Sequence, residues 1–434
     1  MGKDFPISFR FSADEFIPGG VTLDEGVKIA QTLEQSGIDV LHVSAGIYES
    51  LPTLLEPMSY AQGWRCYLAA EVKKAVKIPV ITVGVIREPF FAEEIMAEGK
   101  ADFVAIGRGL VADPEWPRKA EQGRVSEIQR CIGCNIGCLK ERLTKAIQCS
   151  VNPETGREQN YRKKPLIGRK RRITIVGGGP AGLEAARVAA LRGCEVILHE
   201  KSDRLGGQMR LACLPPGKDK IAWTIEYYEH QMKILEVDVR LSQEASIDRL
   251  LDTSADILII ATGSSPKKPV ASGKRIPFFS ADDVFLSREL PNSGKVAVIG
   301  GGGIGCETAM YLQSKGMRVS IIERLEDIAL DVEQITAWDL KERMGKAGIE
   351  VLVHCKFMGF KGDTLIVKRE GEAIEKFSFD LIIWATGRTP NRGLVEEIER
   401  RSFQGQAHVI GDAKSVGMIH NAIHDGYAVI NGIV

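Results

Sequence analysis

The chain has 434 residues, of which 44% are hydrophobic and 26% are charged, a composition ordinary for a globular protein of about three domains. Its 57 basic residues balance its 57 acidic ones, which argues against nucleic acid or an anionic membrane as a partner. No apolar run approaches roughly 18 residues, and no charged-then-apolar leader is present, so neither a membrane span nor export is predicted. We therefore expect a cytoplasmic protein that acts on a small molecule.

Residues 1–125 repeat one pattern four times, a short apolar run followed by an amphipathic helical stretch. The runs are PISFRFSA (6–13), IDVLHVSAG (38–46), IPVITVGVI (78–86) and ADFVAIGRG (101–109). This alternation predicts parallel strands covered by helices, as in half of a (βα)8 barrel. Four strands cannot close such a barrel, and their outer edges would stay unpaired. We therefore hypothesise that Met1 is not the biological start and that about 200 residues with the first four βα units are absent.

The segment 126–165 carries four cysteines that predict an iron-sulfur site. They are Cys131, Cys134, Cys138 and Cys149, in the run CIGCNIGCLKERLTKAIQC. Three closely spaced thiolates and a fourth beyond a short helix suit one 4Fe-4S cluster. Zinc is the alternative, since C-x-x-C also occurs in zinc ribbons, but a second C-x-x-C is missing. The remaining five cysteines are scattered through apolar segments, as buried thiols are.

Residues 171–201 and 294–324 form an internal repeat. In each copy an apolar strand is followed by G-x-G-x-x-G and then by a helix. The glycines are Gly177, Gly179 and Gly182 in the first copy and Gly300, Gly302 and Gly305 in the second. An acid stands 18 residues after each last glycine, Glu200 and Glu323. Such glycines let backbone N–H groups approach a diphosphate, and the carboxylate binds an adenosine ribose. The pattern predicts two dinucleotide sites; the alternative is two glycine-rich turns without ligands.

The first copy resembles the FAD-binding part of two-dinucleotide flavoprotein reductases. The resemblance rests on RLGGQ (204–208), DILIIATGSSP (256–266) and VIGDAKSVGMIHNAIHDGYAV (409–429). It implies FAD contacts from Gly207, Gln208, Gly263 and Asp412. The second copy stands between ATG (261–263) and ATGRTP (385–390), where that superfamily inserts an NAD(P)H domain, which implies a contact from Gly387. Glu323 would repel a 2′-phosphate, which favours NADH over NADPH despite the nearby Arg318 and Arg324.

Nearly the whole chain resembles the C-terminal two-thirds of the 2,4-dienoyl-CoA reductase group of the Old Yellow Enzyme superfamily, in particular the NADH-dependent bile-acid and enoate reductases. The resemblance implies four parts: half of an FMN-binding barrel (1–125), a 4Fe-4S segment (126–165), an FAD-binding domain (166–285 and 386–434) and an NADH-binding domain (286–385). It implies that Arg10 faces the FMN ring and that Gly84, Gly107 and Arg108 hold its phosphate. Val85 stands where such proteins often carry Gly or Arg.

The same resemblance implies an electron path from NADH to FAD, through the cluster to FMN, and on to an activated C=C bond of an enoyl-CoA, enoate or enone. The catalytic proton donor is unassigned, with Tyr48 as a weak candidate beside the alternative of a surface tyrosine. Two other interpretations stay open. One is an NADH/FAD/4Fe-4S module that feeds electrons to a partner, and the other is a truncated, inactive fragment.

Overall fold

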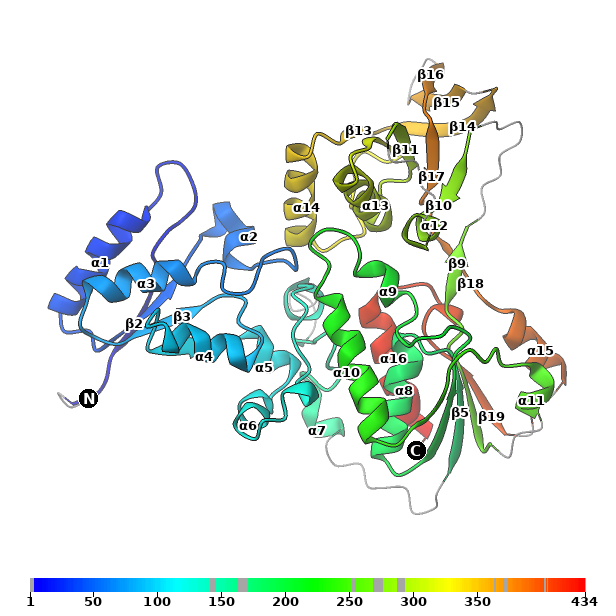
Figure 1. The fold of residues 1–434 in the computed structure, drawn as a ribbon, viewed down its shortest axis with the longest axis horizontal. Coiled ribbons are helices and arrows are strands. Elements are labelled where there is room, and N and C mark those ends of the chain that lie inside the picture. The colour runs from blue at the N-terminus through cyan, green and yellow to red at the C-terminus, as the bar shows by residue number, and fades with distance from the viewer. Residues whose placement is uncertain are drawn as a thin grey trace. The chain divides into compact units, whose positions relative to one another are not determined.

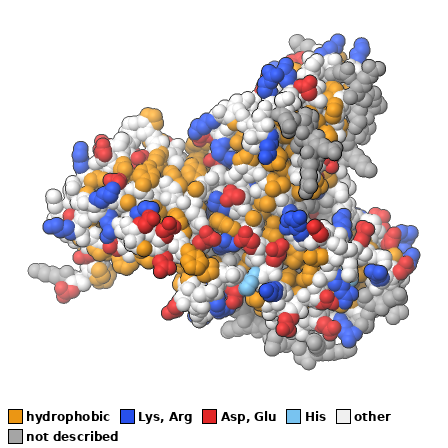
Figure 2. Space-filling model, viewed as in Figure 1, with side chains coloured by type: hydrophobic (Ala, Val, Ile, Leu, Met, Phe, Trp, Pro, Cys, Tyr) orange, Lys and Arg blue, Asp and Glu red, His pale blue; other side chains and the backbone are white. Residues whose placement is uncertain are grey.

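The computed structural model describes residues 4–140, 146–161, 171–251, 255–267, 276–286, 293–362, 364–369, 374–401, 403 and 405–433. The chain divides into two compact units, Met1–Lys145 and Ala146–Val434. Among the helices in these described ranges, none has both the length and the hydropathy needed to cross a membrane. Figure 2 shows acidic and basic side chains interspersed over one face, as their equal numbers lead one to expect.

The first unit contains a four-stranded parallel sheet in the order β1-β2-β3-β4, each strand inside one of the four predicted runs. The strands are β1 (Ser8–Ser12), β2 (Val40–Ser44), β3 (Val80–Val83) and β4 (Phe103–Ala105). The helices are α1 (Leu23–Gln35), η1 (Tyr48–Ser50), α2 (Leu51–Leu54), α3 (Cys66–Ala75), α4 (Pro89–Ala97), α5 (Arg108–Ala112), α6 (Trp116–Glu121), η2 (Val125–Glu127) and the π-helical η3 (Ile136–Lys140). The predicted βα alternation is confirmed.

The two faces of this sheet differ in chemistry because successive strand residues point to opposite sides. Leu41, Val43 and Val80 are buried in an apolar core with residues of α1 and α3. On β1 the alternate positions carry polar groups, and Arg10 lies directly beside His42 in the β1–β2 register. The sheet therefore has one apolar, helix-covered face and one face that carries charge.

The second unit begins with α7 (Glu158–Tyr161) and contains a five-stranded parallel sheet in the order β19-β8-β5-β6-β7. Its strands are β5 (Arg172–Val176), β6 (Glu195–His199), β7 (Asp238–Arg240), β8 (Ile257–Ile260) and β19 (Gln406–Val409). Its helices are α8 (Pro180–Leu191), α9 (Met209–Ala212), α10 (Ile221–Ile234), α11 (Ile247–Leu251), α15 (Gly393–Arg401), η5 (Gly411–Ala413) and α16 (Ile419–Ile433). Figure 1 shows α8, α10 and α16 on one side of this sheet and α11 and α15 on the other.

A second five-stranded parallel sheet, in the order β10-β17-β11-β12-β13, lies between β8 and β19 in sequence. Its strands are β10 (Phe278–Ser280), β11 (Lys295–Ile299), β12 (Arg318–Ile322), β13 (Glu350–Leu352) and β17 (Leu381–Trp384), with the helices α12 (Ala281–Leu286), α13 (Gly303–Ser314) and α14 (Gln334–Lys346). An antiparallel sheet of β14 (Cys355–Lys361), β15 (Thr364–Arg369) and β16 (Ile374–Ser378) adjoins it. Because β10 pairs here with β17, this sheet begins earlier than the predicted boundary at 286.

Two short strands form the crossings between these sheets, β9 (Ser264–Pro266) and β18 (Arg388–Pro390), which pair antiparallel. Asn391 fastens them further, since its side-chain amide donates to the Thr262 carbonyl and its backbone N–H donates to the Gly263 carbonyl. The chain therefore leaves the first sheet and returns to it at the same place.

Candidate functional site

The first glycine-rich turn is built for a close approach between a helix and a strand. A Cβ on Gly182 would lie 1.9 Å from the Gly177 carbonyl oxygen, and one on Gly177 would lie 2.3 Å from that of Ala261. Gly177 also has a φ of 110°, a conformation that favours glycine. Gly179, the N-cap of α8, has nothing within 4 Å of a Cβ. The turn thus leaves open space at the helix N-terminus, which fits the diphosphate of FAD.

Glu200 follows β6 and closes the other side of this turn. Its carboxylate accepts from the backbone N–H groups of Gly178 (2.7 Å) and Ser202 (2.8 Å), and it is only 7% exposed. These bonds fix both oxygens beside the glycines. Oε1 also accepts from the Ser202 hydroxyl (2.7 Å), whereas Oε2 keeps a second lone pair for a ribose hydroxyl. The predicted FAD residues Gly177, Gly179, Gly182 and Glu200 therefore lie together.

Ser264 brings three other predicted FAD residues together, although the sequence did not single it out. Its hydroxyl donates to Asp412 (2.6 Å) and accepts from Gln208 Nε2 (3.1 Å), and a Cβ on Gly263 would lie 3.6 Å from that same amide. Gly207 lies nearby, because a Cβ on Gly207 would be 2.9 Å from the Cα of Gly179. Asp412 also accepts from the Gly417 N–H (3.0 Å).

Arg388 joins this group to the second sheet. Its Nε donates to the Ser264 hydroxyl (2.9 Å), and its guanidinium forms a bidentate ion pair with Asp282 on α12 (2.6 and 2.9 Å). Bidentate pairs of this kind are geometrically specific. Ser264 and Arg388 each follow an A-T-G tripeptide directly, and that shared position was the signal that could have identified them.

The second glycine-rich turn repeats the first. A Cβ on Gly305 would lie 1.9 Å from the Gly300 carbonyl oxygen, and Gly300 has a φ of 106°. Glu323 accepts from the backbone N–H groups of Gly301 (2.6 Å) and Leu325 (2.7 Å). Gly302 is the N-cap of α13, and Gly387, with a φ of 112°, follows β17 at the same edge of the sheet. These residues fit a second dinucleotide.

Of the predicted FMN residues, Arg10 lies on the sheet face that also carries His42. Arg10 donates to the Ser44 hydroxyl (3.1 Å), and the buried Nε2 of its neighbour His42 has no partner among the described residues. Burial, together with the charges of Arg10 and Arg65, lowers the pKa of His42 to about 4. Cationic side chains beside an unsatisfied nitrogen fit a ligand that has hydrogen-bonding groups and gains negative charge on reduction, such as a flavin.

Lowering the pH is expected to destabilise the first unit through His42. The unfolded state binds a proton with a pKa near 6.5, whereas the folded state resists it until about pH 4. The stability is therefore full above about pH 6.5 and falls as the pH drops toward about 4. We expect the urea midpoint of the wild type to fall more than that of His42→Phe between about pH 7 and pH 5. Equal losses in both proteins would show that His42 is not the sensor.

Arg65 and Glu56 form a buried ion pair beneath the predicted phosphate residues. Arg65 is 4% exposed and Glu56 is 2% exposed, with 3.1 Å between Nη2 and Oε1. Glu56 also pairs with Arg108 (2.7 Å), whose Nη1 donates to Asn135 (2.5 Å). A Cβ on Gly84 would lie 2.5 Å from Arg65 Nε, so this glycine makes room for the guanidinium. To bind a phosphate, the Arg108 guanidinium would have to share its N–H groups between the phosphate and its present acceptors, Glu56 and Asn135.

The other residues of this predicted phosphate site differ in conformation. Gly107 has nothing within 4 Å of a Cβ, which leaves space beside its backbone. Val85 is buried with a φ of 48°, a conformation that is strained for a β-branched residue.

The loop with the first three predicted cluster ligands packs against this same part of the first unit. Arg87 Nε donates to the Cys131 carbonyl (3.1 Å), and the Asn135 amide donates to the Leu55 carbonyl (2.9 Å). The Gly133 N–H points to Cys131 Sγ (3.4 Å). Burial, and to a lesser extent the charges of Cys134 and Cys131, raises the pKa of the Cys138 thiol to about 12.

The fourth predicted ligand, Cys149, belongs to the second unit, where α16 holds it. His424 Nε2 donates to its carbonyl (2.8 Å), and the His424 ring stacks on that of His420 at 4.0 Å. Among the described residues, no three His, Cys, Asp or Glu side chains are arranged as a metal site. The 4Fe-4S cluster therefore stays a prediction.

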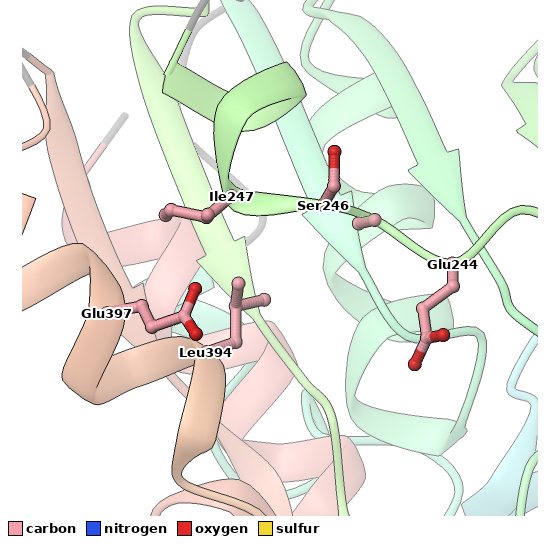
Figure 3. A pocket seen from close by; sticks show the side chains of 6 residues that line it. Glu244, Ser246, Ile247, Leu394 and Glu397 are labelled. Carbon is pink, nitrogen blue, oxygen red and sulfur yellow. The ribbon is translucent and has the colours of Figure 1, made fainter.

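Tyr48, the candidate proton donor, lies on η1 and is 83% exposed. No described neighbour encloses its ring. A pocket shown in Figure 3 lies elsewhere, in the second unit beside α11 and α15, and none of its lining residues was predicted from the sequence. The lining residues are Glu244, Ala245, Ser246, Ile247, Leu394 and Glu397.

Comparisons with known proteins match both parts of the chain. Residues 1–127 match the NADH:flavin oxidoreductase / NADH oxidase family, and residues 171–406 match the pyridine nucleotide-disulphide oxidoreductase family. The chain is 48% identical to an NADH oxidase of Thermoanaerobacter brockii, and the alignment covers 99% of the chain and 67% of that protein. It is 33% identical to a cinnamate reductase of Clostridium sporogenes, and this alignment covers 100% of the chain and 67% of that protein.

A solved structure of 2-naphthoyl-CoA reductase in complex with 2-naphthoyl-CoA shares the fold, with a TM-score of 0.91 and 30% identity over 98% of the chain and 65% of that protein. The chain thus spans about two-thirds of the length of the relatives it matches. The predicted resemblance is confirmed. The chain belongs to the NADH:flavin oxidoreductase / NADH oxidase family and continues into a pyridine nucleotide-disulphide oxidoreductase domain.

Proposed function

We propose that this chain carries the NADH, FAD, 4Fe-4S and FMN sites of an ene-reductase that reduces an activated C=C bond of an enoate, enone or enoyl-CoA. The main support is that two dinucleotide turns, each with its acid bound to the glycine-rich backbone, stand in one chain with an FMN-type half barrel. Relatives named cinnamate reductase and 2-naphthoyl-CoA reductase support the substrate class. A cytoplasmic location stays a prediction of the sequence.

The two dinucleotides would be held by the residues around the two glycine-rich turns. Glu200 and Glu323 would orient the two adenosine riboses, while the helix N-termini after Gly179 and Gly302 would receive the diphosphates. The flavins and the cluster would supply the hydride and single-electron chemistry between NADH and the C=C bond. The contact of Arg108 with Asn135, inside the cysteine loop, supports a short path between the cluster and FMN.

A second candidate function is an electron-transfer module that passes electrons from NADH through FAD and the cluster to a partner. It is favoured by the second unit, Ala146–Val434, which contains both dinucleotide turns and matches the pyridine nucleotide-disulphide oxidoreductase family over residues 171–406.

Cofactor analysis of anaerobically purified protein separates these functions. The ene-reductase predicts about four irons with acid-labile sulfide, FAD and FMN. Iron and FAD without FMN, together with NADH-driven dye reduction, would favour the electron-transfer module. Zinc in place of iron would contradict both.

Replacing Glu323 with alanine is expected to narrow the preference for NADH over NADPH. The carboxylate lies where the adenosine ribose would bind, and its charge would repel a 2′-phosphate. With the charge gone, the exposed Arg324 could attract that phosphate. The ratio of kcat/KM for NADH and NADPH in FAD reduction measures the effect, with Glu326→Ala, in the same loop, as the control. An unchanged ratio would mean that the ribose is recognised elsewhere.

A further inference from the structure

The two glycine-rich turns correspond position by position, with each residue of the second copy 123 places after its counterpart. The correspondence extends past the strand and its acid. The Gly206 N–H donates to the Gly178 carbonyl (2.8 Å), and the Ala329 N–H donates to the Gly301 carbonyl (2.7 Å). By this register, Gln208 in the first copy corresponds to Asp331 in the second. The two copies therefore differ at this position: the first copy has a neutral amide, and the second has a carboxylate.

The two counterparts bind different partners. Gln208 donates to Ser264 and leaves the N-terminus of α8 free, where Pro180 at the first helical position has no N–H to offer. In the second copy the first helical residue is Gly303, and its N–H donates to Asp331 Oδ1 (2.8 Å). A Cβ on Gly302 would lie 3.3 and 3.4 Å from the two Asp331 oxygens. The carboxylate thus stands at the N-terminus of α13.

This position matters because the N-terminus of α13 is where the diphosphate of a dinucleotide would lie, and both groups are anions. The side chain is exposed, and no Lys or Arg within the described ranges forms an ion pair with it. A bound diphosphate would either displace the carboxylate from the Gly303 N–H or lie beside an uncompensated negative charge.

We propose that Asp331 weakens the second dinucleotide site by competing for the α13 N-terminus, so that NADH and NAD⁺ exchange there while FAD stays bound at the first site. The inference rests on the proposed function in that it takes the second turn as the NADH site. Asp331 is then a residue that sets affinity by charge, distinct from Glu323, which recognises the ribose.

Calorimetric titration of the FAD-containing protein with ADP-ribose and with adenosine tests this proposal. Asp331→Asn keeps an oxygen for the Gly303 N–H and removes only the charge. We expect it to tighten ADP-ribose binding about tenfold, as expected from removing one like charge at close range, and to leave adenosine binding unchanged. Asp327→Asn is the matched control, since Asp327 lies in the same loop but pairs with Lys341. It should bind both ligands as the wild type does.

The salt dependence provides a second measurement. Because Asp331 is exposed, the difference between wild type and Asp331→Asn should shrink as ionic strength rises. Equal or weaker ADP-ribose binding by Asp331→Asn would overturn the proposal, and so would an equal gain for adenosine. If the wild type bound neither NADH nor ADP-ribose, the second turn would not be a nucleotide site, and the proposed function would fall with the inference.

Discussion

Replacing Cys134 with alanine is expected to remove the broad visible absorbance of an iron-sulfur cluster and about four irons per chain, while NADH still reduces FAD. The reason is that removing one of four thiolate ligands destabilises a cubane cluster, whereas the two dinucleotide turns lie in the other unit of the chain. Three measurements check this. Iron analysis counts the irons per chain, electron paramagnetic resonance of the reduced protein detects the cluster, and stopped-flow absorbance follows the reduction of FAD by NADH.

Cys213→Ala is the matched control, because Cys213 is also a half-buried cysteine but follows α9, away from the cysteine loop. It should keep its iron. Loss of FAD reduction in Cys134→Ala would contradict the order in which NADH reduces FAD before the cluster. Unchanged iron would remove Cys134 from the ligand set.

Replacing Glu56 with alanine is expected to destabilise the first unit by about 3–5 kcal/mol, the usual cost of leaving one partner of a buried ion pair alone. Glu56 accepts from Arg65, Arg108 and the Trp64 indole, so the change leaves three donors without this acceptor. Burial lowers the pKa of the Arg65 guanidinium, and the charge of Glu56 opposes that shift, so the carboxylate stabilises the buried cation. Urea unfolding, followed by hydrogen exchange in residues 56–75, measures the loss.

An exposed pair on α3 provides the comparison. Glu71 and Lys74 are 2.6 Å apart, but their side chains are 46% and 70% exposed. Glu71→Ala should therefore cost less than about 1 kcal/mol. If Glu56→Ala costs no more than Glu71→Ala, the buried pair does not support the unit. A reduced FMN content at unchanged stability would instead place the role of Glu56 in the flavin site.

Local patterns in the sequence were enough to predict the strands and the glycine turns. Each strand of the first sheet falls inside a predicted apolar run because parallel strands buried under helices require such runs. The turns were predictable because only glycine allows the 1.9 Å approaches at Gly182 and Gly305. Both signals lie within about 30 residues of chain, the length of a βαβ unit.

Contacts between distant residues were not predictable in this way. Glu56 and Arg65 belong to types that normally lie on surfaces, and nothing nearby indicates that they are buried together. Ser264 and Arg388 meet only because an inserted sheet returns the chain to its starting point. The role of Tyr48 and the ligand set that includes Cys149 depend on partners that local spacing does not specify.

The pairing of β9 with β18 also bears on how this architecture can be engineered. The Lys267 N–H donates to the Gly387 carbonyl (3.0 Å), so the ends of the inserted segment already touch. A segment whose ends are held this close can change its length at a small cost in chain entropy, because the cost of loop closure grows only slowly with length. The nucleotide-binding insertion thus has the geometry of an exchangeable cassette: a short turn, or a homologous module with another coenzyme preference, could replace it without moving the strands of the sheet that surrounds it.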